Sequence, residues 1–489
     1  MCARVAWEPG DAATAADGGV WADPLVRLLQ AELAVRGGRI TELEDDNARL
    51  REESQRLRSE LEETRRAGKR QAASFSRGER KPNPGRGGRK PGPDYGAKAR
   101  RLPPPPEQVD QVVEVGLPKA CPDCGGQVAL DKVIEQLQEE LVPAHSRMRR
   151  YDIALGHCNS CKRRVRSRHP EQTSNALGAA GVMLGARAHA LAAWLHIGLG
   201  VPMAKTSKIL AALGGLSVTP GGLHSALHKT AGDAETTYQA LLEALRRSEA
   251  VAADETGWRI DGERAWLWTY VGDAVTVYDI APGRGYDQAK AILGEDFSGV
   301  IERDGWTAYR KFAEATHQTC LAHLLRRCRE LGEVAVGGQA RVPGELRRIL
   351  LDALATRDQR LEGEALTEAV AALAARIDAF CQHQCAHEPN RRLVKHVTAE
   401  RDHLLTFLTH PGVQATNWEA EQALRGMIVN RKNWGGNKTR QGADTAAVLA
   451  SVLRTAIQQG VDPIEALAEI QRTGQIPAGL VLACAGRSP

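Results

Sequence analysis

The sequence lacks three features that would assign it to common classes of protein. It has no apolar run of about 18 residues, the length that a membrane helix needs, because the nearest candidate, Leu177–Val201, is interrupted by Arg187, His189 and His196. The opening residues, MCARVAWEPGD, contain no basic region followed by an apolar stretch, so no secretory signal is visible. Ten cysteines among 489 residues are too few for a disulfide scaffold. We therefore expect a cytoplasmic protein without a membrane partner.

The length of 489 residues is too great for one hydrophobic core, so we expect a multidomain chain of roughly three or four modules. Composition and hydrophobic pattern change at several points along the chain. The predicted segments are residues 20–66, 67–108, 109–170, 171–247, 248–440 and 441–489.

Residues 20–66 carry a heptad pattern that predicts a coiled coil, a leucine zipper. The apolar positions contain mainly leucine, with the single Asn47 at an a position, which is a known way to fix a parallel dimer in register. Gly37-Gly38 interrupts the pattern, so its strongest part is Ile40–Leu61. An amphipathic helix packed on its own protein would give a similar pattern. The a positions are Val26, Leu33, Ile40, Asn47, Ser54 and Leu61, and the d positions include Leu29, Leu43, Leu50 and Leu57.

Residues 67–108 form a Gly-, Pro- and Arg-rich segment that cannot bury a core and should be a tether. Between Arg65 and Arg101 there are 13 Lys and Arg residues against two acids, Glu79 and Asp94. This local excess of positive charge favours a polyanionic partner, although a solvated linker has the same composition.

Two C-x-x-C pairs lie in residues 109–170, separated by the strand-like stretch Leu137–Leu155. Four thiolates at this spacing predict a zinc ribbon that folds around Zn²⁺. Unliganded core cysteines and a thioredoxin-like redox site are the alternatives, and no βαβ pattern supports the second. Arg163 and Arg164 belong to a basic run that could face a DNA backbone. The four predicted ligands are Cys121, Cys124, Cys158 and Cys161.

Residues 171–247 have a helical pattern. Val201–Leu213, a Gly-rich turn and Gly222–Lys229 together resemble a helix-turn-helix whose second helix would enter a major groove. An ordinary helical hairpin would have the same pattern.

Residues 248–440 begin with three strand-like runs joined by short turns: Val251–Asp254, Ala265–Val271 and Ala274–Ile280. A helix over Tyr286–Leu293 then leads to a strand that ends at Asp304, and another helix leads to a short strand near Thr319. Three antiparallel strands followed by strands that alternate with helices describe a ribonuclease H-like α/β fold.

Carboxylates stand where such a fold would bring them together. Asp254 and Asp304 end neighbouring strands, and Glu421 lies on a predicted helix. Two strand-end aspartates and a helical glutamate are suited to holding Mg²⁺ or Mn²⁺ for two-metal phosphoryl transfer. Glu255 competes with Asp254 for this role, and Glu419 competes with Glu421.

Residues 326–410 are almost wholly helical and predict an all-α insertion in the catalytic domain. Near its middle, Cys381, His383, Cys385 and His387 raise a metal-site hypothesis, although the four side chains cannot converge from one straight helix. Residues 441–489 should form C-terminal helices and a tail.

The motifs resemble those of the insertion sequence 66 family of transposases. They are DET at Asp254, RDGWTAY at Arg303, C-x-A-H-x-x-R-R at Cys320, and N-x-x-A-E-x-A-L-R followed by NRKNWGG after Asn417. The resemblance extends from about Ile40 to Pro463 and includes the order of the modules. It implies a DDE-type trio of Asp254, Asp304 and Glu421. Thr416-Asn417-Trp418 and Gln422 depart from the family pattern.

Several other residues within these motifs are suited to the chemistry of DNA. His323 would contact the scissile phosphate or a metal-bound water. Arg326 or Arg327 would hold a phosphate, and Arg425 would orient Glu421 or bind phosphate. A basic edge that contains an aromatic ring suits DNA near the site; it comprises Arg431, Lys432 and Trp434.

The resemblance implies a metal-dependent DNA transposase that cleaves element ends and joins them to target DNA. Its partners would be double-stranded DNA, a second copy or a larger synaptic complex through the zipper, and companion proteins of the same element. We expect it to be associated with the nucleoid. The alternatives are an inactive DNA-binding regulator, which would have no need of all three carboxylates, and a ribonuclease H-like structure-specific nuclease.

Overall fold

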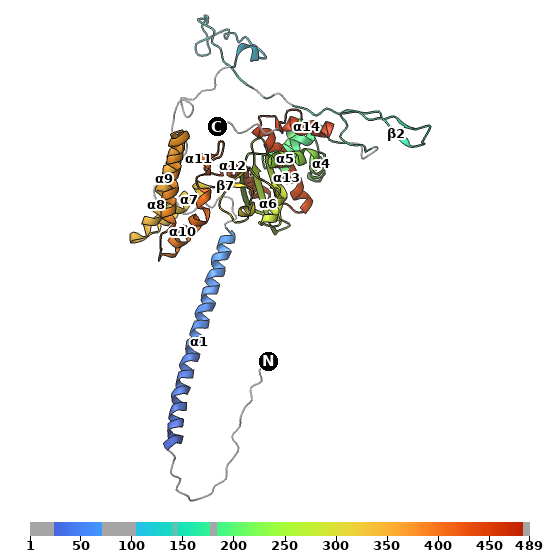
Figure 1. Cartoon of the computed structure of the whole chain (residues 1–489). Helices are drawn as coiled ribbons and strands as arrows, with labels where there is room; N and C mark the ends of the chain where they lie inside the picture. Colours follow the sequence, from blue (N-terminus) through green and yellow to red (C-terminus); the bar gives the residue numbers. More distant parts are fainter. Residues whose placement is uncertain (1–23, 71–103, 140, 142–143, 177–182, 483–489) are drawn as a thin grey trace. The chain divides into compact units, whose positions relative to one another are not determined.

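A computed structural model describes residues 24–70, 104–139, 141, 144–176 and 183–482 (Figure 1). The chain divides into two units, Met1–Val133 and Ile134–Pro489, and each is described by itself. Most of the predicted basic linker, residues 71–103, lies outside the described residues.

The first unit contains one long helix, α1 (Pro24–Arg70), over the segment predicted to be a coiled coil. The helix is continuous through Gly37-Gly38, where the heptad pattern is interrupted, and the Thr41 hydroxyl donates to the Gly37 carbonyl at 3.1 Å. Its described heptad leucines and isoleucine lie exposed along the helix, as Leu33 and Ile40 illustrate at 67% and 56%. The helix is therefore confirmed, and its pairing with a second copy stays a prediction.

The two C-x-x-C pairs adopt the same local turn, although they belong to different units. The N–H of Gly125 donates to the Cys121 carbonyl at 2.9 Å, and that of Lys162 donates to the Cys158 carbonyl at 2.9 Å. Both donors have positive φ, 74° and 58°. Glycine adopts that backbone conformation at little cost, whereas lysine adopts it only with strain.

The predicted strand over Leu137–Leu155 is largely absent. Among the described residues from 137 to 154 no strand is formed, and the pairing begins only at Leu155. A short antiparallel hairpin flanks the second C-x-x-C pair instead, with strands β1 (Leu155–His157) and β2 (Arg164–Arg166). Exposed side chains throughout this hairpin show that it has no apolar core of its own.

The helices predicted over residues 171–247 pack on the central sheet of the second unit and share its hydrophobic core. The second helix of the suggested helix-turn-helix buries Leu223, Leu227 and Ala231 in that core. One short π-helical segment, Trp194–Gly198, directly follows the helix over Ala186–Ala193. The helices are α2 (Ala186–Ala193), α3 (Met203–Gly214), α4 (Pro220–Asp233) and α5 (Glu235–Arg246).

A five-stranded sheet lies at the centre of the second unit, in the order β5-β4-β3-β6-β7. The first three strands form the expected antiparallel meander, and β6 and β7 add in parallel to β3. Helix α6 (Tyr286–Leu293) has the predicted bounds. The strands are β3 (Ala250–Ile260), β4 (Glu263–Val271), β5 (Thr276–Ala281), β6 (Val300–Arg303) and β7 (Thr316–Thr319).

The helix predicted between the last two strands is only a single 3₁₀ turn, Tyr309–Lys311. The predicted short strand near Thr319 ends there, and helix α7 (Leu321–Glu333) begins two residues later. Phe312 and Tyr309 are buried in this connection, so packing rather than helical hydrogen bonding determines its path.

Helix α13 (Arg440–Gln458) covers the free edge of β5. The backbone N–H of Tyr278 donates to the Ser451 hydroxyl at 2.8 Å, and that of Thr276 donates to the Thr455 hydroxyl at 3.1 Å. Ser451 and Thr455 are one helical turn apart, so they lie on the same face of α13. Helix α12 (Trp418–Trp434) packs against β3 and β4, and helix α14 (Pro463–Thr473) packs against α13 and α2.

The predicted all-α insertion forms a second hydrophobic core. Phe380 and Leu346, both fully buried, lie at its centre. No described helix of the chain is both long enough and apolar enough to span a membrane. The helices of the insertion are α8 (Arg341–Asp358), α9 (Gly363–Cys381), α10 (Glu388–Glu400) and the short α11 (Thr406–Thr409).

Candidate active site

The sheet brings the two predicted aspartates to neighbouring positions. In the parallel pairing of β3 with β6, Ala252 lies opposite Glu302, and two residues further along each chain are Asp254 and Asp304. Asp304 directly follows β6, and its carboxylate accepts a hydrogen bond from the backbone N–H of Trp306 at 2.9 Å. This turn closes the strand end and fixes the direction of the Asp304 side chain.

Glu421 approaches this pair from the first turn of α12. The turn is attached to β3 through Asn417, which is fully buried and whose side-chain amide donates to the Ala253 carbonyl at 3.3 Å. The backbone N–H of Glu421 donates in turn to the Asn417 carbonyl at 3.2 Å. Asn417, one of the departures from the family pattern, therefore holds the glutamate helix against the strand that carries Asp254.

The carboxylates influence one another electrostatically. Burial, followed by the charges of Glu255, Asp304 and Glu421, raises the pKa of Asp254 to about 8. Such a cluster is unfavourable unless a proton or a cation neutralises it. Hard carboxylate oxygens from two strand ends and a facing helix fit a divalent cation such as Mg²⁺, which prefers oxygen ligands. The donor set therefore matches the metal that the motif implies.

Glu255, the rival of Asp254, is occupied within the protein. Its side chain is fully buried; one carboxylate oxygen accepts from Arg284 Nε at 2.6 Å, and the other accepts from the Tyr309 hydroxyl at 2.8 Å. Burial and the charge of Asp304 raise its pKa, and Arg284 opposes them. Because both oxygens already have partners, Asp254 is better placed than Glu255 to bind a cation.

Arg284 is a functional candidate that the sequence analysis missed. Its guanidinium lies over the rings of Trp306 and Trp266, at 3.9 Å and 4.8 Å from their centroids, and one nitrogen is 4.0 Å from Asp304. It links the carboxylates of Glu255 and Asp304. The residue occurs alone in the Gly-rich loop between β5 and α6, where sequence spacing gives no signal.

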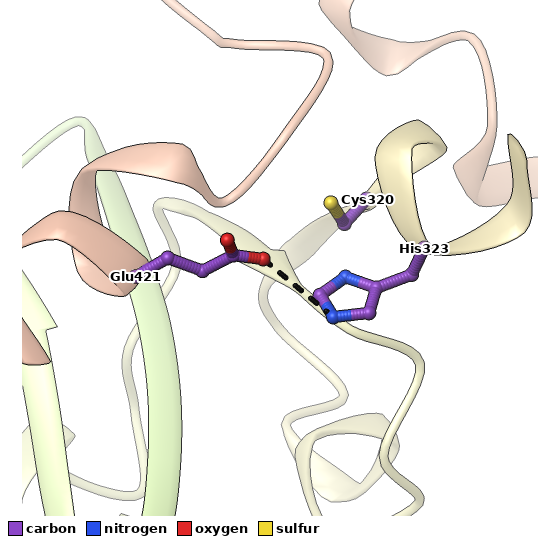
Figure 2. Close-up of side chains that lie close together, drawn as sticks. All are labelled: Cys320, His323 and Glu421. Carbon is purple, nitrogen blue, oxygen red and sulfur yellow. Dashed lines mark ion pairs between the residues drawn. The ribbon is translucent and has the colours of Figure 1, made fainter. Parts of the chain in front are cut away.

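His323 and Cys320 lie beside Glu421 (Figure 2). His323 is in the first turn of α7, and its Nε2 is 3.6 Å from Glu421 Oε1. Cys320 immediately precedes that helix and is buried, which raises the pKa of its thiol. In the part of the chain that the structure describes, these are the three Cys, His, Asp or Glu side chains whose donor atoms all lie within 4.8 Å of one another. The donor atoms of Asp254, Asp304 and Glu421 do not all lie within this distance of one another.

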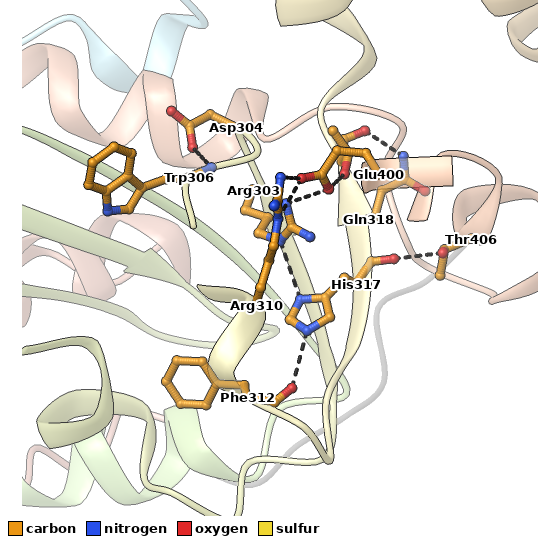
Figure 3. A network of polar contacts seen from close by, with 10 residues as sticks. Arg303, Asp304, Trp306, Arg310, Phe312, His317, Gln318, Glu400 and Thr406 are labelled. Carbon is orange, nitrogen blue, oxygen red and sulfur yellow. Dashed lines mark hydrogen bonds and ion pairs between the residues drawn. The ribbon is translucent and has the colours of Figure 1, made fainter. Parts of the chain in front are cut away.

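A buried network ties the Asp304 strand to the helical insertion (Figure 3). Arg303, the residue before Asp304, places Nη1 2.8 Å from Glu400 Oε2 in α10, and neither side chain is exposed. Arg303 Nη1 is not aligned for a hydrogen bond, so the contact is an ion pair. Arg310 Nε and the Thr319 hydroxyl donate to the Glu400 carboxylate at 2.8 Å and 2.7 Å. The insertion therefore contacts the strand one residue from the site.

The predicted DNA-binding residues on α7 and α12 are accessible. Arg326, Arg425 and Lys432 are exposed, and Arg327 is half-buried. Arg326 lies on the helix of His323, and Arg425 lies one turn beyond Glu421, so both are close along the chain to the candidate site. Their contact with DNA stays a prediction.

Two residues of the predicted basic edge have internal partners. Arg431 donates to the Gly257 carbonyl in β3, and burial lowers its pKa. The Trp434 ring stacks on His196, with centroids 4.9 Å apart, and meets Trp258 edge-on at 5.9 Å. The structure thus places both side chains where they attach the end of α12 to the core, and their contact with DNA stays a prediction.

Arg163 and Arg164 are exposed beside the second C-x-x-C turn. Backbone hydrogen bonds within each turn lower the pKa of one thiol. The N–H of Asp123 has the largest effect on the pKa of Cys121, and the N–H of Cys161 has the largest effect on the pKa of Cys158. Lowered thiol pKa values favour the thiolate form that zinc binds. The two turns lie in separately described units, so the four-cysteine site stays a prediction.

The suggested metal cluster in the insertion does not form among the described residues. Helix α9 ends at Cys381, and His383 turns to Glu345, with 3.0 Å between His383 Nε2 and the carboxylate. Cys385 and His387 follow beyond the end of the helix. Because the chain leaves the helix here, the four side chains do not share one face.

The fold and site together define an α/β protein with a carboxylate centre at adjacent strand ends. The chain belongs to the IS66 family of transposases, whose family model matches residues 181–445, more than half of its length. It is also similar to three proteins of Sinorhizobium fredii (strain NBRC 101917 / NGR234).

Uncharacterized protein y4qI is 27% identical over 263 residues, 47% of this chain and 48% of the relative. Uncharacterized protein y4hP is 26% identical over 240 residues, 42% of this chain and 43% of the relative. The match thus spans about half the length of these two relatives. Uncharacterized protein y4jD is 24% identical over 389 residues, 72% of this chain and 74% of the relative.

Proposed function

We propose that this protein is a DDE-type DNA transposase that cleaves the ends of an insertion sequence and joins them to target DNA. The observation that carries the proposal is the approach of three carboxylates from separate elements: Asp254 in β3, Asp304 after β6 and Glu421 in α12. The electrostatic effect of Asp304 and Glu421 on the pKa of Asp254 supports their proximity. Membership of the transposase family supports the substrate class.

In this mechanism Asp254 and Asp304 would hold divalent cations at the strand ends, and Glu421 would complete the site from the facing helix. Bound Mg²⁺ or Mn²⁺ supplies activation of the attacking oxygen and charge stabilisation of the leaving oxygen. His323, with Nε2 3.6 Å from Glu421 Oε1, would contact the scissile phosphate. Arg284 keeps the Glu255 and Asp304 carboxylates in place through its two charged contacts.

The other modules are proposed to bring DNA and a second copy to this site. Helix α1 would pair through its exposed leucines, and the two C-x-x-C turns would hold Zn²⁺ as a ribbon. Arg326, Arg327, Arg425 and Lys432 would contact phosphates near the carboxylates. We further propose that the sheet with its helices is a ribonuclease H-like domain, on the grounds of the strand order β5-β4-β3-β6-β7.

Cleavage and joining of a labelled duplex carrying the element end, with Mg²⁺, tests the proposal. Glu421→Gln should abolish both steps while leaving DNA binding intact, because the change removes the charge and keeps the shape. Glu419→Gln is the matched control in the same helical turn and should retain activity. If only Glu419→Gln lost activity, Glu419 and not Glu421 would be the third carboxylate of the trio. Full activity in Glu421→Gln would refute the mechanism.

A further inference from the structure

Outside the aspartate pair, the structure gathers a second set of donors of different chemistry. Cys320, His323 and Glu421 come from the residue before α7, the first turn of α7 and the first turn of α12. Their donor atoms lie within 4.8 Å of one another, and Figure 2 shows the Glu421 carboxylate and the His323 ring facing each other with Cys320 beside them. A thiol, an imidazole and a carboxylate form a mixed donor set that oxygen-preferring Mg²⁺ does not use and that Zn²⁺ does.

One donor–donor distance in the cluster matches that of a tetrahedral zinc site. Metal–ligand lengths of about 2.0–2.3 Å place neighbouring donor atoms of a tetrahedral site roughly 3.3–3.8 Å apart. The 3.6 Å separation of His323 Nε2 and Glu421 Oε1 already meets this spacing. His323 Nδ1, on the other side of the ring, is buried and has no hydrogen-bond partner among the described residues.

The backbone holds the donors in position before any ion binds. The N–H of Cys320 donates to the Arg303 carbonyl at 2.7 Å, which ties the cysteine to the end of β6. Leu321 donates to the Ala415 carbonyl at 2.9 Å, so the start of α7 is fixed to the segment that leads into α12. The segments that carry Cys320 and Glu421 are thus joined through the backbone, which fixes the positions of the two residues relative to each other.

The cluster also has an open side. The side chains of His323 and Glu421 are 31% and 28% exposed, so an ion there could take water or a phosphate oxygen as its fourth ligand. Cys320 by contrast is buried.

We propose that Cys320, His323 and Glu421 bind a thiophilic divalent cation, Zn²⁺, and that its binding withdraws Glu421 from the Asp254–Asp304 centre and inhibits DNA cleavage. The inhibitory half of this inference rests on the proposed transposase function; the binding half does not. Competition follows because Glu421 is shared: a carboxylate directed to Zn²⁺ between α7 and α12 is not free to close the site that holds Mg²⁺. Zinc concentration would thereby set the activity of the enzyme.

Metal binding is tested first, on the full-length chain and without DNA. The protein is saturated with Zn²⁺ and dialysed against a weak zinc buffer, and bound zinc per chain is measured by elemental mass spectrometry. Wild type should retain one ion more than Cys320→Ser and one more than His323→Gln. Cys328→Ser is the matched control, since Cys328 is a buried cysteine of α7 outside the cluster, and it should retain the wild-type number. Equal zinc content in all four proteins would overturn the site.

Inhibition is tested next, with each protein compared with its own zinc-free rate of Mg²⁺-dependent cleavage. The zinc concentration that halves the rate should be at least tenfold higher for Cys320→Ser than for wild type or Cys328→Ser. Unchanged inhibition in Cys320→Ser would overturn the regulatory role. If wild type does not cleave DNA at all, the proposed function fails, while the zinc counts still decide whether the site exists. Circular dichroism identifies any variant that has not folded, and the remaining cluster variant then decides the zinc count.

Discussion

Replacement of Glu400 by glutamine should destabilise the protein far more than loss of an ordinary ion pair. Arg303 and Glu400 have no exposed side-chain area, and the glutamate oxygens also accept from Arg310 and Thr319. Glu400→Gln leaves the Arg303 charge buried without its counter-ion, for which a cost of about 3–5 kcal/mol is typical. The control Asp352→Asn removes an exposed pair with Arg376 in the insertion and should cost no more than about 1 kcal/mol.

Urea unfolding followed by tryptophan fluorescence measures the difference between these variants. The double variant Arg303→Met with Glu400→Gln removes both charges and should recover much of the loss, since apolar replacements of buried pairs are often tolerated. A loss below about 1 kcal/mol in Glu400→Gln, similar to that in the exposed control, would refute the reasoning.

Acid should have the same effect as the Glu400 substitution. Burial alone would raise the pKa of Glu400, but the Arg303 charge, the Thr319 hydrogen bond and Arg310 outweigh it, so the pKa lies below the ordinary value of 4.5. A carboxyl group with a lowered folded-state pKa stabilises the protein above its unfolded-state pKa. That contribution is lost as the pH falls through the folded-state value. The acid limb of the stability profile should therefore be shallower in Glu400→Gln.

Three further outcomes are expected. The pKa of Asp254 is raised to about 8, so a bound cation must displace the proton of its carboxyl group. Mg²⁺ affinity should therefore rise up to about tenfold per pH unit between pH 6 and pH 8. Calorimetric titration measures this affinity, and an affinity that does not change with pH would contradict the prediction. Arg284→Gln should lower kcat with little change in DNA affinity in a filter-binding assay, since Arg284 positions Glu255 and Asp304, whereas a large loss of affinity would assign it to DNA. Zinc removal by a chelator should release ions from wild type but fewer from Cys121→Ser, as measured with a colorimetric zinc indicator.

The central sheet could be predicted because its signals are local. The strand-like runs that became β3, β4 and β5 are separated by short turns, and α6 has clear Gly boundaries on both sides. The aspartates could be placed because each stands at a fixed offset from an apolar strand, and the parallel register of β3 and β6 then brings them together. Local pattern and sheet geometry agree at these positions.

The remaining features depend on contacts between residues that are far apart in the sequence. The pairing of Arg303 with Glu400 joins positions almost one hundred residues apart, and no spacing rule connects them. The sequence between β6 and β7 predicts a helix, yet burial of Tyr309 and Phe312 limits this connection to one 3₁₀ turn. The packing of Trp434 on His196 and Trp258 could not be predicted either, because its basic neighbourhood in the sequence gives no sign of these two rings.

The hydroxyl groups of Ser451 and Thr455 have a consequence for assembly. An uncovered edge strand exposes a row of backbone donors and acceptors to which another chain can add a strand. On β5 the backbone N–H groups of Thr276 and Tyr278 are already bonded to α13, so the sheet cannot be extended there by a strand from a second protomer. Two copies of the chain would therefore not associate by adding a strand at β5, and stable aggregation through this edge is disfavoured.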